Sequence, residues 1–191
     1  MEWEMENEDV LKIFRKAGAI LNGHFILRSG RHSAIYMQKA HVFMHADFTE
    51  RLCCAIAAQI RLEIGDIDYI AGLAIGGLIP AYETSRHLSV PVIWVERDEF
   101  GLFKLRRFQI KSGARIVILE DVMTTGSSVQ AALDAIVHAG GKVIAVACII
   151  DRSGGKIDFG VPLIALAQYE VASYEADSLP EELSLLPAMK L

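Results

Sequence analysis

An acidic pair followed by a run of small hydroxyl residues is the part of this chain best suited to chemistry. Glu120 and Asp121 come directly after the apolar stretch that ends at Leu119, and the segment from Thr124 to Ser128 reads Thr-Thr-Gly-Ser-Ser. Ligands of open α/β sheets bind at the carboxyl ends of the strands, and free N–H groups at a helix start attract anions. The pattern predicts a phosphate site beside carboxylates that accept hydrogen bonds from sugar hydroxyls.

The same residues have a purely structural interpretation, in which a strand ends in an acidic turn and a serine caps the next helix. Adjacent acids followed by small and hydroxyl residues favour the sugar-phosphate site. The chain contains neither the GxxxxGK[ST] pattern of a nucleotide-binding P-loop nor the GxGxxG pattern of a dinucleotide fold. A sugar phosphate is therefore the expected ligand.

Two further segments have the composition of anion-binding elements. Gly76 and Gly77 follow an apolar stretch, where backbone N–H groups can receive an anion, although a structural turn fits as well. Residues 96–111 are basic and contain Lys104, Arg106, Arg107 and Lys111. This second segment is interpreted either as a mobile lid that neutralises a polyanion or as a solvated hairpin.

The pattern between these segments predicts the scaffold. Apolar strands alternate with helices, which indicates right-handed crossovers and a parallel sheet covered on both faces. Strands are expected at 69–74, 92–95, 115–119, 143–150 and 162–167, and helices at 80–88 and from about 129. Ahead of them we expect a helix at 7–17, an antiparallel strand pair at 24–28 and 33–38, and a helix to about 64 that starts with a capping box of Asp47 and Glu50. Residues 177–191 fit either a short edge helix or a loose tail.

Composition sets the broad class of the protein. The 191 residues are 52% hydrophobic with a net charge of −5, which excludes a disordered chain and disfavours an electrostatic nucleic-acid binder. The longest apolar run, Val143 to Ile150, is far shorter than the roughly 20 residues of a membrane span. The acidic N-terminus lacks the features of a signal peptide, and the three cysteines are expected to be reduced. A single cytoplasmic domain without membrane or nucleic-acid partners is expected.

Three segments resemble a known family. Leu119 to Ser128 resembles the phosphoribosyl pyrophosphate (PRPP) motif of type I phosphoribosyltransferases. Phe25 to Gln38 is similar to the N-terminal segment of orotate phosphoribosyltransferases, and Ile149 to Gly155 to the strand end that carries their orotate-binding arginine. The resemblance implies a mostly parallel central sheet flanked by helices in one domain, 1–191, with a small hood at about 1–45, a core at about 46–170 and an edge segment at 171–191.

The resemblance also implies roles for individual residues. Glu120 and Asp121 would bind ribose hydroxyls and stabilise a cationic transition state, with Lys104 as a further catalytic cation. The implied PRPP-binding residues are Glu120, Asp121, Val122, Met123, Thr124, Thr125, Gly126, Ser127, Ser128, Gly76, Gly77 and Arg97. The implied orotate-binding residues are Arg28, Tyr36, Met37, Thr124 and Arg152. The implied cofactor is Mg²⁺ that arrives with PRPP rather than on metal-binding side chains, and the implied assembly is a homodimer.

The basic segment departs from the family pattern, which has an Arg-Lys pair, a further Lys and a His-Gly. No histidine occurs between His87 and His138, and Arg97 lies near the usual lysine. The implied activity is transfer of the phosphoribosyl group from PRPP to orotate, giving orotidine 5′-monophosphate and pyrophosphate in UMP biosynthesis. One alternative is a purine-base phosphoribosyltransferase, which shares the 120–128 motif. Another is a non-catalytic regulator that senses PRPP and binds nucleic acid through the basic stretch.

Overall fold

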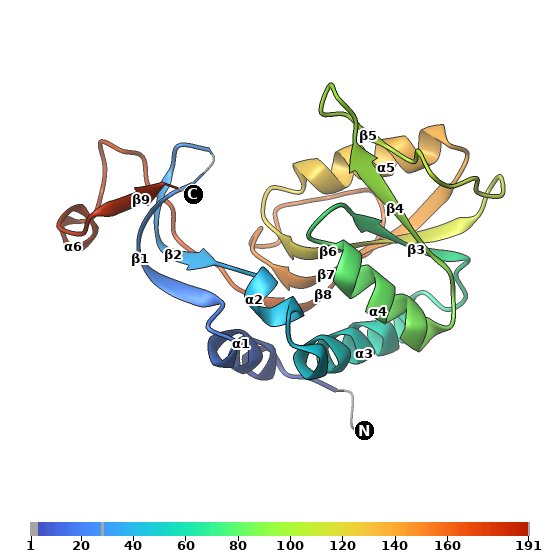
Figure 1. The fold of residues 1–191 in the computed structure, drawn as a ribbon, viewed down its shortest axis with the longest axis horizontal. Helices are drawn as coiled ribbons and strands as arrows, with labels where there is room; N and C mark the ends of the chain where they lie inside the picture. The colour runs from blue at the N-terminus through green and yellow to red at the C-terminus, as the bar shows by residue number, and fades with distance from the viewer. Residues whose placement is uncertain (1–3, 28, 191) are drawn as a thin grey trace.

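A computed structural model describes residues 4–27 and 29–190 of the chain. It contains a six-stranded sheet and a separate three-stranded sheet, which lies to one side of the larger one (Figure 1). Residue Arg28, predicted to bind orotate, lies outside the described residues. No helix within the described ranges has the length and apolar character needed to cross a bilayer.

The larger sheet has the strand order β5-β4-β3-β6-β7-β8. Its strands are β3 (Tyr69–Leu73), β4 (Val92–Arg97), β5 (Phe103–Lys104), β6 (Arg115–Met123), β7 (Lys142–Asp151) and β8 (Leu163–Gln168). All neighbours are parallel except β5, which turns back antiparallel to β4. The mostly parallel α/β sheet predicted from the alternating pattern is confirmed.

Helices cover both faces of this sheet because its central strands are apolar on both sides. Along β6, Val117 and Leu119 pack with one core cluster while Ile116 and Ile118 pack with the other, as period-two alternation requires. Helices α1 (Asn7–Lys16), α3 (Ala46–Glu63) and α4 (Leu78–Leu88) supply the first cluster, and α5 (Ser127–His138) supplies the second.

Several expected element boundaries are wrong, among them the start of β1 and two at the acidic segment. Strand β6 continues to Met123, so Glu120 and Asp121 lie within its last four residues rather than beyond its end. Helix α5 begins at Ser127 after a left-handed Gly126 with φ 73°, a conformation that favours glycine. The capping box is also wrong, because α3 follows His45 without any side-chain cap hydrogen bond.

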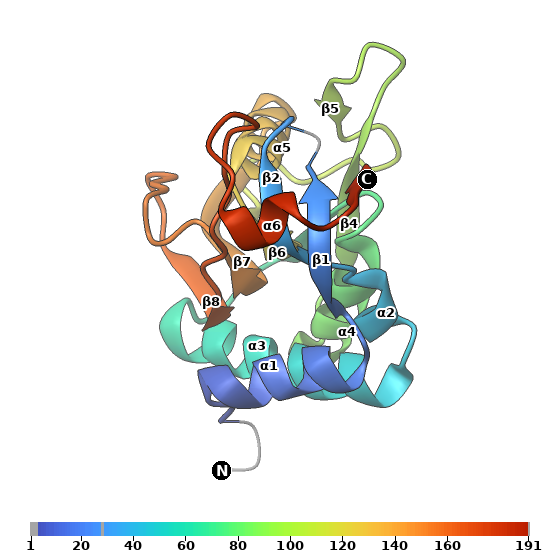
Figure 2. The same cartoon turned by 90° about the vertical axis from the view of Figure 1, so that its left-hand side faces the viewer.

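The smaller sheet combines two strands from the N-terminal part of the chain with one strand near its C-terminus. Strands β1 (Ile20–Ile26) and β2 (His32–Met37) pair antiparallel, as predicted, and β9 (Ala188–Lys190) adds a parallel edge strand to β1. A buried hydrogen bond of 2.6 Å joins His24 Nε2 to His32 Nδ1, and His24 Nδ1 donates to the Leu186 carbonyl at 3.0 Å. The C-terminal segment is thus an edge strand preceded by the short helix α6 (Glu181–Ser184), seen beside β1 in Figure 2.

Candidate active site

The acidic pair on β6 is asymmetric, with Asp121 buried and Glu120 half-buried. Asp121 is fully buried, and its Oδ1 accepts hydrogen bonds from Lys39 Nζ and from the Val122 N–H, each at 2.6 Å. Asp121 Oδ2 has no hydrogen-bond partner among the described residues. Burial, and then repulsion from Asp121, raises the pKa of Glu120 to about 8. Glu120 therefore holds its proton more tightly than a free carboxyl does, so the pair resists a second negative charge.

The segment from Thr124 to Ser128 forms the bend between β6 and α5. Thr125 Oγ1 and Ser127 Oγ lie 3.0 Å apart, and α5 starts at Ser127 with its free N–H groups at the bend. Arg97 Nη2 lies 3.5 Å from Ser128 Oγ, so a cation from the end of β4 reaches the same place. The predicted anion site combines helix N–H groups, hydroxyls and one guanidinium.

Val122 and Met123 make hydrogen bonds at the candidate site through their backbone groups. The Val122 N–H donates to Asp121, and the Met123 carbonyl accepts a hydrogen bond of 2.8 Å from the Arg152 N–H. The Met123 side chain is buried in the core. These bonds tie the acid pair to the end of β7.

The Gly76–Gly77 turn lies against the acid pair. A Cβ at Gly77 would come within 2.9 Å of the Leu119 carbonyl oxygen and of the Leu73 nitrogen, and a Cβ at Gly76 would overlap Asp121 Oδ2. Close backbone packing alone requires glycine at 77. It also brings the turn between β3 and α4 to the acids, where a ligand can contact both.

Arg152 follows β7, and one donor of its guanidinium lacks a hydrogen-bond partner among the described residues. Its guanidinium is half-buried, burial lowers its pKa, and its Nε is buried without a hydrogen-bond partner in the part of the chain that the structure describes. A buried donor without a partner is unfavourable. A planar carboxylate would satisfy such a guanidinium with two parallel hydrogen bonds.

The two hood residues expected near the base point in different directions. Met37 is 4% exposed and packs in the core cluster shared with α1 and α3. Tyr36 is half-buried, with its ring centroid 5.7 Å from that of Phe25. Neighbouring residues on a strand face opposite sides of the sheet, so one pyrimidine ring cannot pack against both side chains.

The basic segment forms a hairpin in which three cations, Lys104, Arg106 and Arg107, pair with acids of the same segment. Lys104 Nζ lies 2.7 Å from Asp98, and Arg107 Nε lies 3.0 Å from Glu96. The hydrogen bond from Lys104 lowers the pKa of Asp98. The structure thus places Lys104 within the hairpin rather than beside the acid pair.

Lys39 is a residue of this site that the sequence reasoning missed. Its contact with Asp121 joins positions 82 residues apart. No spacing motif includes Lys39, and the strand pattern that drew attention to residues 33–38 ends one residue before it. The lone signal was a lysine directly after a strand of the hood.

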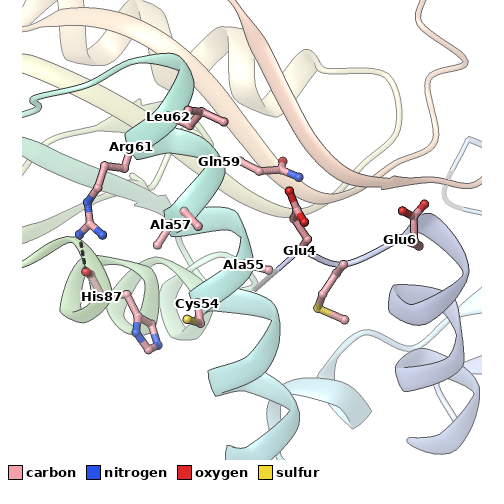
Figure 3. Close-up of a pocket in the computed structure, with 11 residues that line it drawn as sticks. Glu4, Glu6, Cys54, Ala55, Ala57, Gln59, Arg61, Leu62 and His87 are labelled. Carbon is pink, nitrogen blue, oxygen red and sulfur yellow. Dashed lines mark hydrogen bonds between the residues drawn. The ribbon is translucent and has the colours of Figure 1, made fainter. Parts of the chain in front are cut away.

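A separate cavity of about 810 Å³ lies along α3 and the segment Glu4–Glu6. Cys54, Ala57 and Leu62 of α3 line it, and Arg61 nearby donates to the His87 carbonyl at 2.8 Å (Figure 3). None of the predicted site residues is in its lining. The cavity therefore has no part in the site on β6.

Comparison with known proteins agrees with this fold. The family model for the phosphoribosyl transferase domain matches residues 48–159. The orotate phosphoribosyltransferase of Bartonella quintana is 64% identical over 97% of each chain. The crystal structure of orotate phosphoribosyltransferase from Aeropyrum pernix matches with a TM-score of 0.72 and 27% identity, covering 83% of this chain and 93% of that chain. Leishmania donovani UMP synthase matches with a TM-score of 0.73 and 25% identity over 87% of this chain but 37% of that longer chain.

The fold is that of a type I phosphoribosyltransferase. The alignment with orotate phosphoribosyltransferases over 97% of each chain identifies the family within this class. The chain belongs to the orotate phosphoribosyltransferase family.

Proposed function

We propose that this protein transfers the phosphoribosyl group of PRPP to orotate in pyrimidine nucleotide biosynthesis. The observation that carries the choice of base is Arg152, whose half-buried guanidinium lacks a partner for Nε next to the sugar-phosphate bend. Orotate brings a carboxylate that would complete it. The neutral purine bases bring no such group, which ranks the purine alternative below orotate.

The reaction joins N1 of orotate to C1′ of the ribose. The C1′–oxygen bond to pyrophosphate breaks, the electron pair leaves with pyrophosphate, and the N1 proton passes to solvent. Glu120 and Asp121 accept hydrogen bonds from ribose hydroxyls and stabilise positive charge that develops at C1′. The 5′-phosphate lies in the bend of Thr124 to Ser128, with Arg97 beside it.

The same residues fit a magnesium ion that enters with PRPP. No group of three or more His, Cys, Asp or Glu side chains among the described residues is placed to hold a metal. The oxygen ligands of the ion would come largely from the substrate. Glu120 and Asp121 would hold the ion indirectly, by orienting the ribose hydroxyls. When bound, Mg²⁺ supplies charge neutralisation for the leaving pyrophosphate.

The assembly we propose is a homodimer that acts in the cytoplasm. Ile75, Ile79 and Tyr82 are 85%, 53% and 59% exposed and follow one another at helical spacing on and just before α4. An exposed apolar stripe of this kind marks a protein interface. Free Cys53, Cys54 and Cys148 are consistent with a reducing compartment. Sedimentation of the wild type and of an Ile79→Glu variant tests the dimer, which the substitution should dissociate.

The decisive experiment is a base-competition assay with PRPP and Mg²⁺. Purified protein should release pyrophosphate with orotate and not with adenine, hypoxanthine or xanthine. Turnover with a purine base but not with orotate would contradict the proposal. Salt-dependent RNA or DNA binding without any turnover would favour the regulator instead.

A further inference from the structure

Three segments that are distant in the chain meet at the Lys39 side chain. Lys39 lies between β2 and helix α2 (Ala40–Phe43), and its carbonyl accepts the Val42 N–H at 2.9 Å. Its Nζ lies 2.6 Å from Asp121 Oδ1 and would lie 3.3 Å from a Cβ placed at Gly76. The hood, the acidic strand and the Gly76–Gly77 turn therefore converge at one ammonium group.

The contact between Lys39 and Asp121 is not a closed structural ion pair. The Lys39 side chain is 38% exposed while that of Asp121 is 1% exposed, so the cation lies on the solvent side of the acid. Asp121 Oδ2 remains without a hydrogen-bond partner in the described ranges. Ion pairs that serve stability alone satisfy their hydrogen bonds. Here an ammonium group with three donors is partly exposed to solvent, and the acid beside it has an unpaired oxygen.

The charge of the expected leaving group adds a second argument. Pyrophosphate requires cations, and Lys104, Arg106 and Arg107 of the hairpin, like Lys39, each lie within 4 Å of an acid, so what distinguishes Lys39 is its position. Lys39 is a cation already positioned beside the glycine turn where the pyrophosphate is expected. Its side chain can turn from Asp121 to an anion without any movement of the backbone, which α2 holds in place.

We propose that Lys39 binds the pyrophosphate group of PRPP. In the free protein its ammonium pairs with Asp121. When the activated sugar enters, the ammonium contacts pyrophosphate at the Gly76–Gly77 turn and releases Asp121 Oδ1 to a ribose hydroxyl. This inference rests on the proposed function only in taking PRPP as the substrate.

The test is calorimetric titration with magnesium pyrophosphate and, separately, with ribose 5-phosphate. Neither ligand involves orotate, so the result is independent of which base is the acceptor. Lys39→Met should weaken pyrophosphate binding by about tenfold or more, as expected for loss of a charge-assisted contact. It should not weaken ribose 5-phosphate binding, and Lys39→Arg should retain most of the pyrophosphate affinity because the cation is kept.

Controls separate binding from folding. Lys142→Met, an exposed lysine at the start of β7 and at the opposite end of the sheet from the site, should leave both affinities unchanged. Thermal unfolding reports whether each variant is folded, and Lys39→Gln replaces Lys39→Met if the latter is not. An unchanged pyrophosphate affinity in a folded neutral variant overturns the proposal. An equal loss for both ligands also overturns it, because Lys39 would then act only by supporting Asp121.

Discussion

Residues 120–128 and residues 96–111 are both expected to contact PRPP, but their polar groups are held in different ways. The first region begins at the end of a buried strand, where the ladder between β6 and β7 holds the backbone in place as far as Met123. The second is a hairpin beyond the sheet edge, where Lys104, although 55% exposed, pairs with Asp98. A strand end presents groups that are already oriented, whereas the hairpin must exchange its internal ion pairs for contacts with the substrate.

This difference has a physical consequence for catalysis. Preorganised groups stabilise charge without reorganisation at the moment of reaction, and exposed ion pairs are weak enough to break at little cost. We therefore expect the largest mutational effects at the strand end and smaller ones in the hairpin.

The largest expected effect is that of Asp121→Asn. The change keeps the shape of the side chain but removes the charge that stabilises the sugar cation, so kcat should fall by about 100-fold or more. Steady-state pyrophosphate release measures it, with thermal unfolding to show that the variant is folded. Asp134→Asn, on the exposed side of α5, is the matched control. Full activity of Asp121→Asn would remove the acid pair from the site.

Arg152→Ala should weaken orotate binding by about 30-fold or more, because truncation of one partner of a buried charge pair costs at least 2 kcal/mol or so. The KM for orotate measures the effect, while the affinity for PRPP should stay close to that of the wild type. Arg152→Lys should be intermediate, since an ammonium cannot make the paired bonds of a guanidinium. Equal losses for both substrates would contradict the assignment.

Lys104→Met probes the hairpin directly. Because the Lys104–Asp98 pair is exposed on the lysine side, we expect a loss of turnover of about tenfold or less. Arg106→Met, whose partner Glu99 lies 3.9 Å away, provides the comparison within the same hairpin. A loss from Lys104→Met as large as that from Asp121→Asn would show that the hairpin is as preorganised as the strand end.

The last expected effect is on the pH dependence of stability, which is read as a melting temperature rather than as a rate. The folded-state pKa of Glu120 is raised from 4.5 to about 8, so the folded protein holds a proton that the unfolded chain has lost. The contribution of Glu120 to stability is therefore present below pH 4.5 and is lost as pH rises toward about 8. The Tm of the wild type should fall across this pH interval relative to that of Glu120→Gln. The expected fall is about 2–4 °C for each kcal/mol of unfolding free energy that is lost. Parallel pH profiles would contradict the raised pKa.

The local features of this protein could be read from its sequence. The alternation of apolar strands and helices predicted the fold class, and the run from Glu120 to Ser128 marked the acids and the bend that we expect to bind an anion. Both follow from short-range physics, since side-chain alternation and free N–H groups at a helix start depend on neighbouring residues.

Only the tertiary structure decided which distant groups meet. It placed Lys39 beside Asp121 and left Nε of Arg152 without a partner in the described ranges. It also paired Lys104 with Asp98 and buried Met37 in the core. It also brought β9 onto β1 at the opposite end of the chain. Such contacts depend on sheet order and on how the hood packs over the core. No local pattern encodes them, because each joins residues whose separation is set by the whole fold.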